Sequence, residues 1–255
     1  MTIKQLLAIG ATASCAWTAS TLTARADAPA SAPAASAPLR SLVYSFQYGV
    51  QQDASARDSA NQASAAMEGS GITHYTGSLN DSGTMTVQIM REQPDKGLVV
   101  IVSEEGKDTR KAPPVICVVY ANTTVLCDPN KTVNPEEFTL LRFLSANFID
   151  PSKVDAKQHW NVNEDNANFQ VDADYTIDRV DNGIMTIGES RKIKQKGMGA
   201  TTSDVESKIV YDYGRAVPDS INEYVTQRMD AGMAGTSTTI YQTTLQLLTD
   251  SMNKG

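Results

Sequence analysis

Apolar and polar side chains alternate along most of the second half of the chain, between Phe169 and Leu248. In the segment 169–178, the apolar residues occupy one parity and the polar residues occupy the other. A strand that has one buried and one solvated face requires this period of two. The pattern therefore predicts a sheet with one continuous apolar face, built from strands over 168–178, 184–194, 202–213, 220–229 and 236–249.

The first half of the chain predicts further strands. Residues 41–50 alternate in the same way, and the runs 72–79 and 83–90 are expected to form a hairpin, because turn-forming residues occupy 80–83. The runs 98–103 and 115–120 are apolar at both parities. We expect strands of that kind to be covered on both faces.

One segment, 135–146, has the spacing of an amphipathic helix. Asn134 is a suitable N-cap, Pro135 suits the first helical position, and two glutamates follow in the first turn. Strands that are mostly sequential neighbours form a meander, and a long meander must curl. The expected fold is therefore mainly β: a single curved antiparallel meander (half-barrel) of about ten strands, with this one amphipathic helix packed on its concave face.

The pair Cys117 and Cys127 lies in two apolar runs that flank Asn122, a residue that suits a hairpin turn. If the loop is 121–123, Tyr120 faces Thr124 and the two cysteines face one another across the hairpin, close enough for a disulfide. A metal site is less favoured, because the spacing of the cysteines is not that of metal ligands and no histidine lies nearby. We expect a structural disulfide.

The amino terminus has the features of a secretory signal. Lys4 precedes an apolar run over 6–17, and Ala24 and Ala26 give the small-residue pattern of a cleavage site. We therefore expect a signal peptide over 1–26, export to the periplasm or the extracellular space, and no helical membrane span. Lipidation at Cys15 is a less favoured alternative.

After cleavage, the Pro/Ala/Ser-rich segment 27–40 is expected to be a disordered tether. Residues 41–251 are long enough for one β-rich domain. Within this domain the segment 51–70, which is rich in Ala, Ser and Gln, is expected to be a mobile insertion.

The charge of the chain excludes one class of partner. The net charge is −7, and the mature chain is more negative because the signal peptide contains Lys4 and Arg25. An acidic surface with no basic stripe repels nucleic acid. We therefore expect no nucleic-acid partner.

No motif of catalysis is present, so we expect a non-enzymatic protein without a cofactor. The two histidines, His74 and His159, do not stand in a known catalytic arrangement, although a triad assembled from distant residues would not be visible in sequence. The aspartates at 172, 174, 178 and 181 lack the calcium-loop pattern and suit a solvated strand face. A secreted hydrolase remains an alternative.

The expected helix 135–146 and the strands 169–177 and 205–248 together resemble the half-barrel of periplasmic lipoprotein carriers (the LolA/LolB type), at the level of architecture. In that family a helix lies against the concave face of a curled meander, and the apolar concave surface shields acyl chains. The resemblance implies the fold and no individual binding residue, because fold does not fix function.

These patterns lead to an expected function, the binding of a lipid, an acyl chain or another apolar ligand in a groove of the curved sheet. Ordinary packing of the same residues against the helix is an equal interpretation. A cell-envelope protein-interaction scaffold and an outer-membrane barrel are the alternatives. The candidate lining residues are Phe169, Val171, Tyr175, Ile177, Ile209, Tyr211 and Tyr213.

Overall fold

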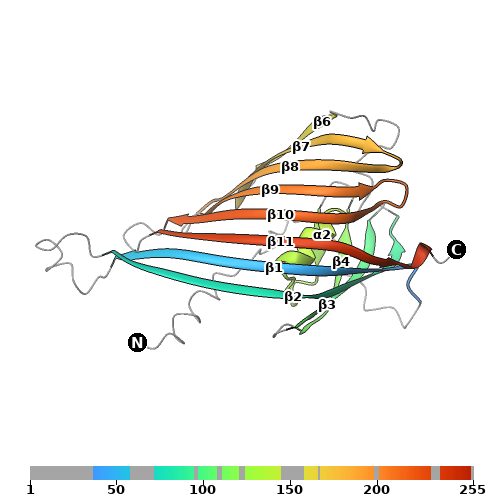
Figure 1. Ribbon diagram of the computed structural model, residues 1–255, viewed down its shortest axis with the longest axis horizontal. Coiled ribbons are helices and arrows are strands. Elements are labelled where there is room, and N and C mark those ends of the chain that lie inside the picture. Colours follow the sequence, from blue (N-terminus) through green and yellow to red (C-terminus); the bar gives the residue numbers. More distant parts are fainter. Residues whose placement is uncertain are drawn as a thin grey trace, which may run out of the picture.

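The computed structural model describes residues 37–57, 72–94, 97–107, 111–120, 124–144, 158–165, 167–197, 201–230 and 236–253. These residues form one eleven-stranded antiparallel sheet, a short α-helix and a terminal 3₁₀ turn (Figure 1). The elements are β1 (Arg40–Arg57), β2 (Ile72–Glu92), β3 (Leu98–Gly106), β4 (Lys111–Val119), β5 (Val125–Cys127), α2 (Pro135–Arg142), β6 (His159–Asp165), β7 (Phe169–Asp181), β8 (Ile184–Gln195), β9 (Thr201–Asp212), β10 (Val217–Asp230), β11 (Thr236–Asp250) and η5 (Ser251–Asn253).

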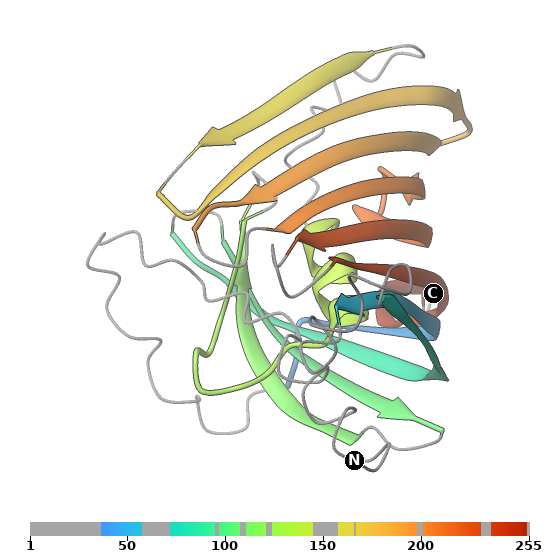
Figure 2. The same ribbon diagram turned by 90° about the vertical axis from the view of Figure 1, so that its left-hand side faces the viewer.

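The first and the last strand pair in the middle of the sheet. The spatial order is β5-β4-β3-β2-β1-β11-β10-β9-β8-β7-β6, so each half of the chain forms its own meander and β1 joins the two along β11. The edges of the described sheet are β5 and β6. The sheet curves strongly but does not close (Figure 2).

Helix α2 lies inside the curve, on the concave face (Figure 2). It contacts β5, β10 and β11, and Leu140, Leu141 and Phe143 are fully buried. The Glu137 carboxylate accepts a hydrogen bond from the backbone N–H of Asn134, 2.9 Å away, at the start of the helix. The concave face of the sheet supplies the rest of this core through inward aromatic and aliphatic side chains.

The expected fold class is confirmed: the protein is mainly β, and its described residues form one curved antiparallel sheet and one short α-helix. The turn between β7 and β8 contains Asn182 and Gly183 at φ values of 48° and 84°, as a tight hairpin of type I′ requires. The cysteine hairpin is also confirmed. Cys117 and Cys127 are cross-strand partners joined by a disulfide, and Tyr120 donates a backbone hydrogen bond to Thr124.

The expected hairpin around 80–83 is wrong, because β2 runs straight through these residues. Asn80 pairs with Gly49 and Gly83 pairs with Phe46, so β1 extends the whole length of β2. A long partner strand overrides local turn preference. Gly83 has a different reason for being glycine, since an added Cβ would lie 2.0 Å from the Glu105 carbonyl oxygen.

Three further boundaries differ from expectation. Residues 51–57 belong to β1 rather than to a mobile insertion, and the rest of that segment lies outside the described residues. Strand β6 occupies residues for which the sequence pattern predicts no strand. Helix α2 ends at Arg142, four residues early. The signal peptide and most of the tether also lie outside the described residues.

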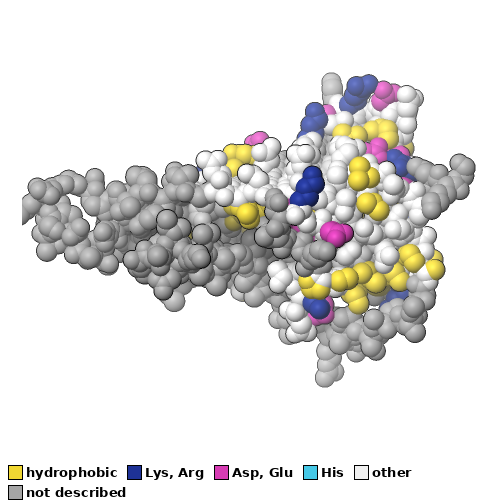
Figure 3. All heavy atoms as spheres, turned by 60° about the horizontal axis from the view of Figure 1, so that its bottom comes forward, with side chains coloured by type: hydrophobic (Ala, Val, Ile, Leu, Met, Phe, Trp, Pro, Cys, Tyr) yellow, Lys and Arg dark blue, Asp and Glu magenta, His cyan; other side chains and the backbone are white. Residues whose placement is uncertain are grey.

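The outer side of β3, β4 and β5 is apolar and is only partly buried. Val99 is buried there, Ile101 and Val118 are half-buried, and Leu126 is 44 % exposed. Figure 3 shows hydrophobic side chains gathered on the face of the molecule that lies toward β2 and β3. The expectation that both faces of these strands are covered therefore holds for the concave face and only in part for the outer one.

Neither α2 nor η5, the helices that the structure describes, is long and apolar enough to cross a membrane.

Candidate functional site

A row of polar or amphipathic side chains crosses the concave face of the sheet, one from each of eight neighbouring strands. Each member is the cross-strand partner of the next. We call this row the inner rank, and from β2 to β6 it consists of Asp81, Tyr48, Thr243, Glu223, Ser207, Glu189, Tyr175 and Trp160. Apolar residues lie on both sides of it along most strands, as Ile221 and Val225 do beside Glu223.

Helix α2 is bound to the inner rank by its last residue. The Arg142 guanidinium donates to Glu189 Oε1 at 2.9 Å and to Glu223 Oε2 at 2.6 Å. One turn earlier, the Thr139 hydroxyl donates to Glu223 Oε1 at 2.6 Å. Ser207 lies between the two glutamates and donates to Glu189 Oε2 at 2.6 Å. All of these side chains are buried.

The charges of this cluster balance one another. Burial by itself raises the pKa of Glu189, but the adjacent Arg142 and Arg191 outweigh it and lower the pKa to about 2. The Tyr175 hydroxyl donates to Glu189 at 2.9 Å. The pKa of Tyr175 is raised, mainly by burial and secondly by the negative charge of Glu189. Arg191 Nε lies 3.6 Å from Glu189, so the sheet itself also supplies this carboxylate with a cation.

The chemistry of the cluster is that of an anchor rather than of a catalyst. Glu189 is ionised at neutral pH, whereas a general acid or base needs a pKa near the working pH. Ser207 bonds to carboxylates that are themselves occupied by Arg142. His159 lies elsewhere, on the outer face of β6, with its Nε2 3.2 Å from Asp174 Oδ1. His74 is in β2 and is not a member of the inner rank.

The residues expected to line an apolar groove all lie in the second half of the sheet, and the structure places them in two groups. Tyr175, Ile177, Ile209 and Tyr211 are buried in the core. Phe169, Val171 and Tyr213 are partly buried, and the last two pack against that core. The core that contains the first group also contains Leu140, Leu141, Phe143 and Leu144 of the helix segment.

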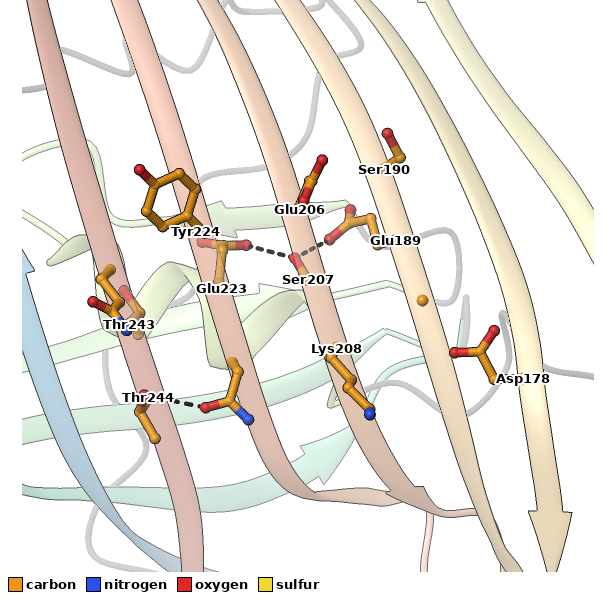
Figure 4. A pocket seen from close by; sticks show the side chains of 13 residues that line it. Asp178, Glu189, Ser190, Glu206, Ser207, Lys208, Glu223, Tyr224, Thr243 and Thr244 are labelled. Atoms are coloured by element: carbon orange, nitrogen blue, oxygen red, sulfur yellow. Dashed lines mark hydrogen bonds between the residues drawn. The ribbon is translucent and has the colours of Figure 1, made fainter.

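Two depressions lie on the opposite, outer face of the same strands. One, of about 460 Å³, lies over β7 to β11, and the other, of about 350 Å³, lies over β1, β2 and β11. Figure 4 shows the first with Tyr224, Glu206 and Ser190 following one another across neighbouring strands, and the helix behind the sheet.

Cross-strand pairing connects the residues of the two depressions into one band on the outer face, which we call the outer track. Its first row consists of the cross-strand partners Asn80, Gly49, Gln242, Tyr224, Glu206 and Ser190. The second row lies two residues along each strand, and it begins at Ser82 and ends at Gly188. Asp178 lies beside Gly188, its Oδ2 3.6 Å from the position of an added Cβ.

Sequence reasoning missed the inner rank, although a signal for it was present. Glu189, Ser207 and Glu223 each occupy the buried parity of their strand. Ser207 and Glu223 lie between aliphatic residues of that parity, and Glu189 follows Ile187 and precedes Arg191. A polar residue on the buried parity of three successive strands indicates a shared polar contact. The matching signal in the predicted helix is Arg142, a charged residue between the apolar Leu141 and Phe143.

The class of protein that this geometry defines is an open, curved antiparallel sheet with helix α2 anchored on its concave face. The chain matches no protein-family model, and no curated protein resembles it in sequence.

Proposed function

We propose that this is an exported, non-enzymatic protein that holds an apolar ligand, such as an acyl chain, on the concave face of its sheet in exchange with helix α2. The observation that carries the proposal is the way the concave face is filled. A broad apolar surface is covered by an eight-residue helix. The end of this helix is held by ion pairs to the inner rank. The proposal agrees with the resemblance to lipoprotein carriers.

The helix and an acyl chain would gain similar free energies from burial on the concave face. Leu140, Leu141, Phe143 and Leu144 are at most 2 % exposed, and burial of four such side chains contributes about 6–12 kcal/mol. An acyl chain of about fifteen methylenes would recover about 12 kcal/mol, at about 0.8 kcal/mol for each methylene. In apolar burial alone, replacement of the helix by such a ligand is therefore close to balanced.

Departure of the helix withdraws Arg142 from both Glu189 and Glu223, and the sheet offsets part of this electrostatic cost at Glu189 alone. Glu189 keeps Arg191 at 3.6 Å when Arg142 is withdrawn. A carboxylate left without any counter-charge in an apolar interior would oppose opening strongly. The second cation on β8 reduces that cost.

The test is lipid-targeted mass spectrometry of natively purified protein, followed by titration of the delipidated protein with a fluorescent C16 fatty acid. Thr139→Val removes a hydroxyl that bonds to Glu223 and keeps the side-chain shape. It should loosen the helix and strengthen fatty-acid binding several-fold. Val99→Ala, at a buried position on the outer side of β3, lowers stability without touching the helix or the concave face and should leave the affinity unchanged. Absence of co-purified lipid together with no fatty-acid uptake by either variant would refute the proposal.

A second candidate function is that of a cell-envelope interaction scaffold without a small ligand. The half-exposed apolar side chains on the outer side of β3 to β5, including Leu126, favour it. In-cell crosslinking from Leu126 replaced by a photoreactive residue would capture a protein partner in that case. Mass spectrometry of the mature chain tests export for both candidates, with cleavage expected after Ala26.

A further inference from the structure

Two glycines in the outer track are required neither by backbone conformation nor by a close backbone contact. An added Cβ at Gly188 would meet no atom closer than 3.6 Å, and at Gly49 the nearest atom, 3.1 Å away, belongs to the exposed Asn80 side chain. Neither glycine has a positive φ. Both lie in strand interiors, where glycine costs about 0.5–1 kcal/mol relative to alanine. The contrast is Gly83, which the Glu105 carbonyl oxygen forces to be glycine.

The same two glycines border the two outer depressions, Gly188 the larger and Gly49 the smaller. A strand-interior glycine occurs at a bulge or where a ligand or another backbone approaches closely. Gly49 pairs in regular register on both sides, and the pairing of β7 with β8 shifts only beyond Ile177. Here the two places lie in one band and face the same way. The glycines and the depressions therefore point to one elongated site rather than to two unrelated irregularities.

The side chains around these depressions have unused hydrogen-bonding groups. Glu206, Lys208 and the Tyr224 hydroxyl make no hydrogen bond or ion pair with any residue that the structure describes. Tyr224 is 44 % exposed, which leaves much of its side chain uncovered. Donors, acceptors and an aromatic surface are thus presented together along the track.

We propose that the outer track binds a short uncharged oligosaccharide, laid across the strands with Tyr224 beneath one ring and Gly188 and Gly49 allowing close approach of others. Hydroxyl groups of a sugar both donate and accept, as the mixed amide, hydroxyl, ammonium and carboxylate groups of the track require. The apolar face of a sugar ring suits an exposed tyrosine, whose hydroxyl remains available for a hydrogen bond.

The charge and the length of the track narrow the ligand further. Glu206 and Asp178 outweigh Lys208, so a polyanion is repelled. From β2 to β8 the track crosses six strands and is therefore about 24 Å long, at about 4.8 Å between neighbouring strands. That length suits a chain of several rings rather than a single sugar. The volumes of the two depressions lie in the usual range of ligand sites.

The test uses the full mature protein and three soluble tetrasaccharides, cellotetraose, chitotetraose and maltotetraose, with isothermal calorimetry and ligand-detected NMR. At least one should bind at millimolar concentration or below. Gly188→Val and Tyr224→Ala should each weaken its affinity about tenfold or more, which corresponds to about 1.4 kcal/mol. A heparin-derived tetrasaccharide should not bind.

The control is Lys194→Ala, an exposed outward position on β8 outside the track. It should bind as the parent does. Gly188→Val should unfold at or above the parental midpoint, so that its loss of binding does not come from a loss of folding. The inference is overturned if none of the three neutral tetrasaccharides binds, or if one binds equally to the parent and to both track variants. The fatty-acid experiment concerns the opposite face of the sheet, so either proposal can fail while the other stands.

Discussion

Arg142 Nη2 lies 2.6 Å from Glu223 Oε2 in the interior of the protein, and this contact joins the end of helix α2 to the middle of β10. The same guanidinium also donates to Glu189 on β8, so one side chain of the helix is bound to two strands.

Replacement of this arginine should be strongly destabilising. Arg142→Met leaves two buried carboxylates with less compensation, which costs about 3–5 kcal/mol of unfolding free energy. Urea denaturation measures this loss. The matched control is Arg179→Met, which breaks a 2.8 Å ion pair to Asp181 at a site where the arginine side chain is 73 % exposed. There the loss should stay below about 1 kcal/mol, and equal losses for the two variants would contradict a buried anchor.

Stability should fall in acid because of Glu189. Its pKa is about 2 in the folded protein and 4.5 in an unperturbed chain. A lowered pKa stabilises the folded state above the unfolded value, and this contribution disappears as the pH falls from about 5 to about 2. The effect is at most about 3 kcal/mol. Thermal unfolding of the parent and of Glu189→Gln between pH 7 and pH 3 measures it. The variant should show the smaller decrease, although it starts from a lower stability.

Two glycine-to-alanine changes should have opposite effects on stability. Gly83→Ala places a Cβ 2.0 Å from the Glu105 carbonyl oxygen, so the β2–β3 contact must shift, at a cost of about 1–3 kcal/mol. Gly188→Ala meets only an ordinary contact and should raise stability by about 0.5 kcal/mol, because alanine has less freedom in the unfolded chain. Chemical denaturation of both variants decides this. A loss at Gly188 comparable to that at Gly83 would show that the fold does require glycine there.

The disulfide should stabilise the fold mainly by restricting the unfolded chain. Cys117 and Cys127 are 10 residues apart in sequence, and closure of so short a loop contributes about 3 kcal/mol. Strand β5 has only three residues and contacts α2. Reduction should therefore lower the midpoint of thermal unfolding. The double variant Cys117→Ala/Cys127→Ala should show the same lower midpoint with and without reductant.

Where one physical signal dominated, the sequence was enough to predict the element. Strict alternation located β7, β8, β9 and β11 to within a few residues, and Asn182-Gly183 specified its turn because both residues tolerate positive φ. Facing positions in a short hairpin likewise predicted the Cys117–Cys127 bond.

The remaining elements depend on partners that are distant in sequence. Turn-forming residues at 80–83 stay extended because β1 pairs with them throughout. Edge strand β6 has only two apolar residues on its inward side, Trp160 and Val162, which are too few for a periodic signal. The inner rank requires the register of eight strands to be known, and alternation within a single strand does not contain that information.

The pairing of β1 with β11 means that the centre of the sheet is built from the two segments furthest apart along the polypeptide. The N-terminal meander can form early, but its β1 edge stays unpaired until the last strand has been synthesised. Contacts between such distant segments slow folding, and exposed edges favour aggregation meanwhile. A nascent chain that stalls before Thr236 would therefore hold a long, uncapped strand, and a chaperone that covers β1 would protect this protein most during its synthesis.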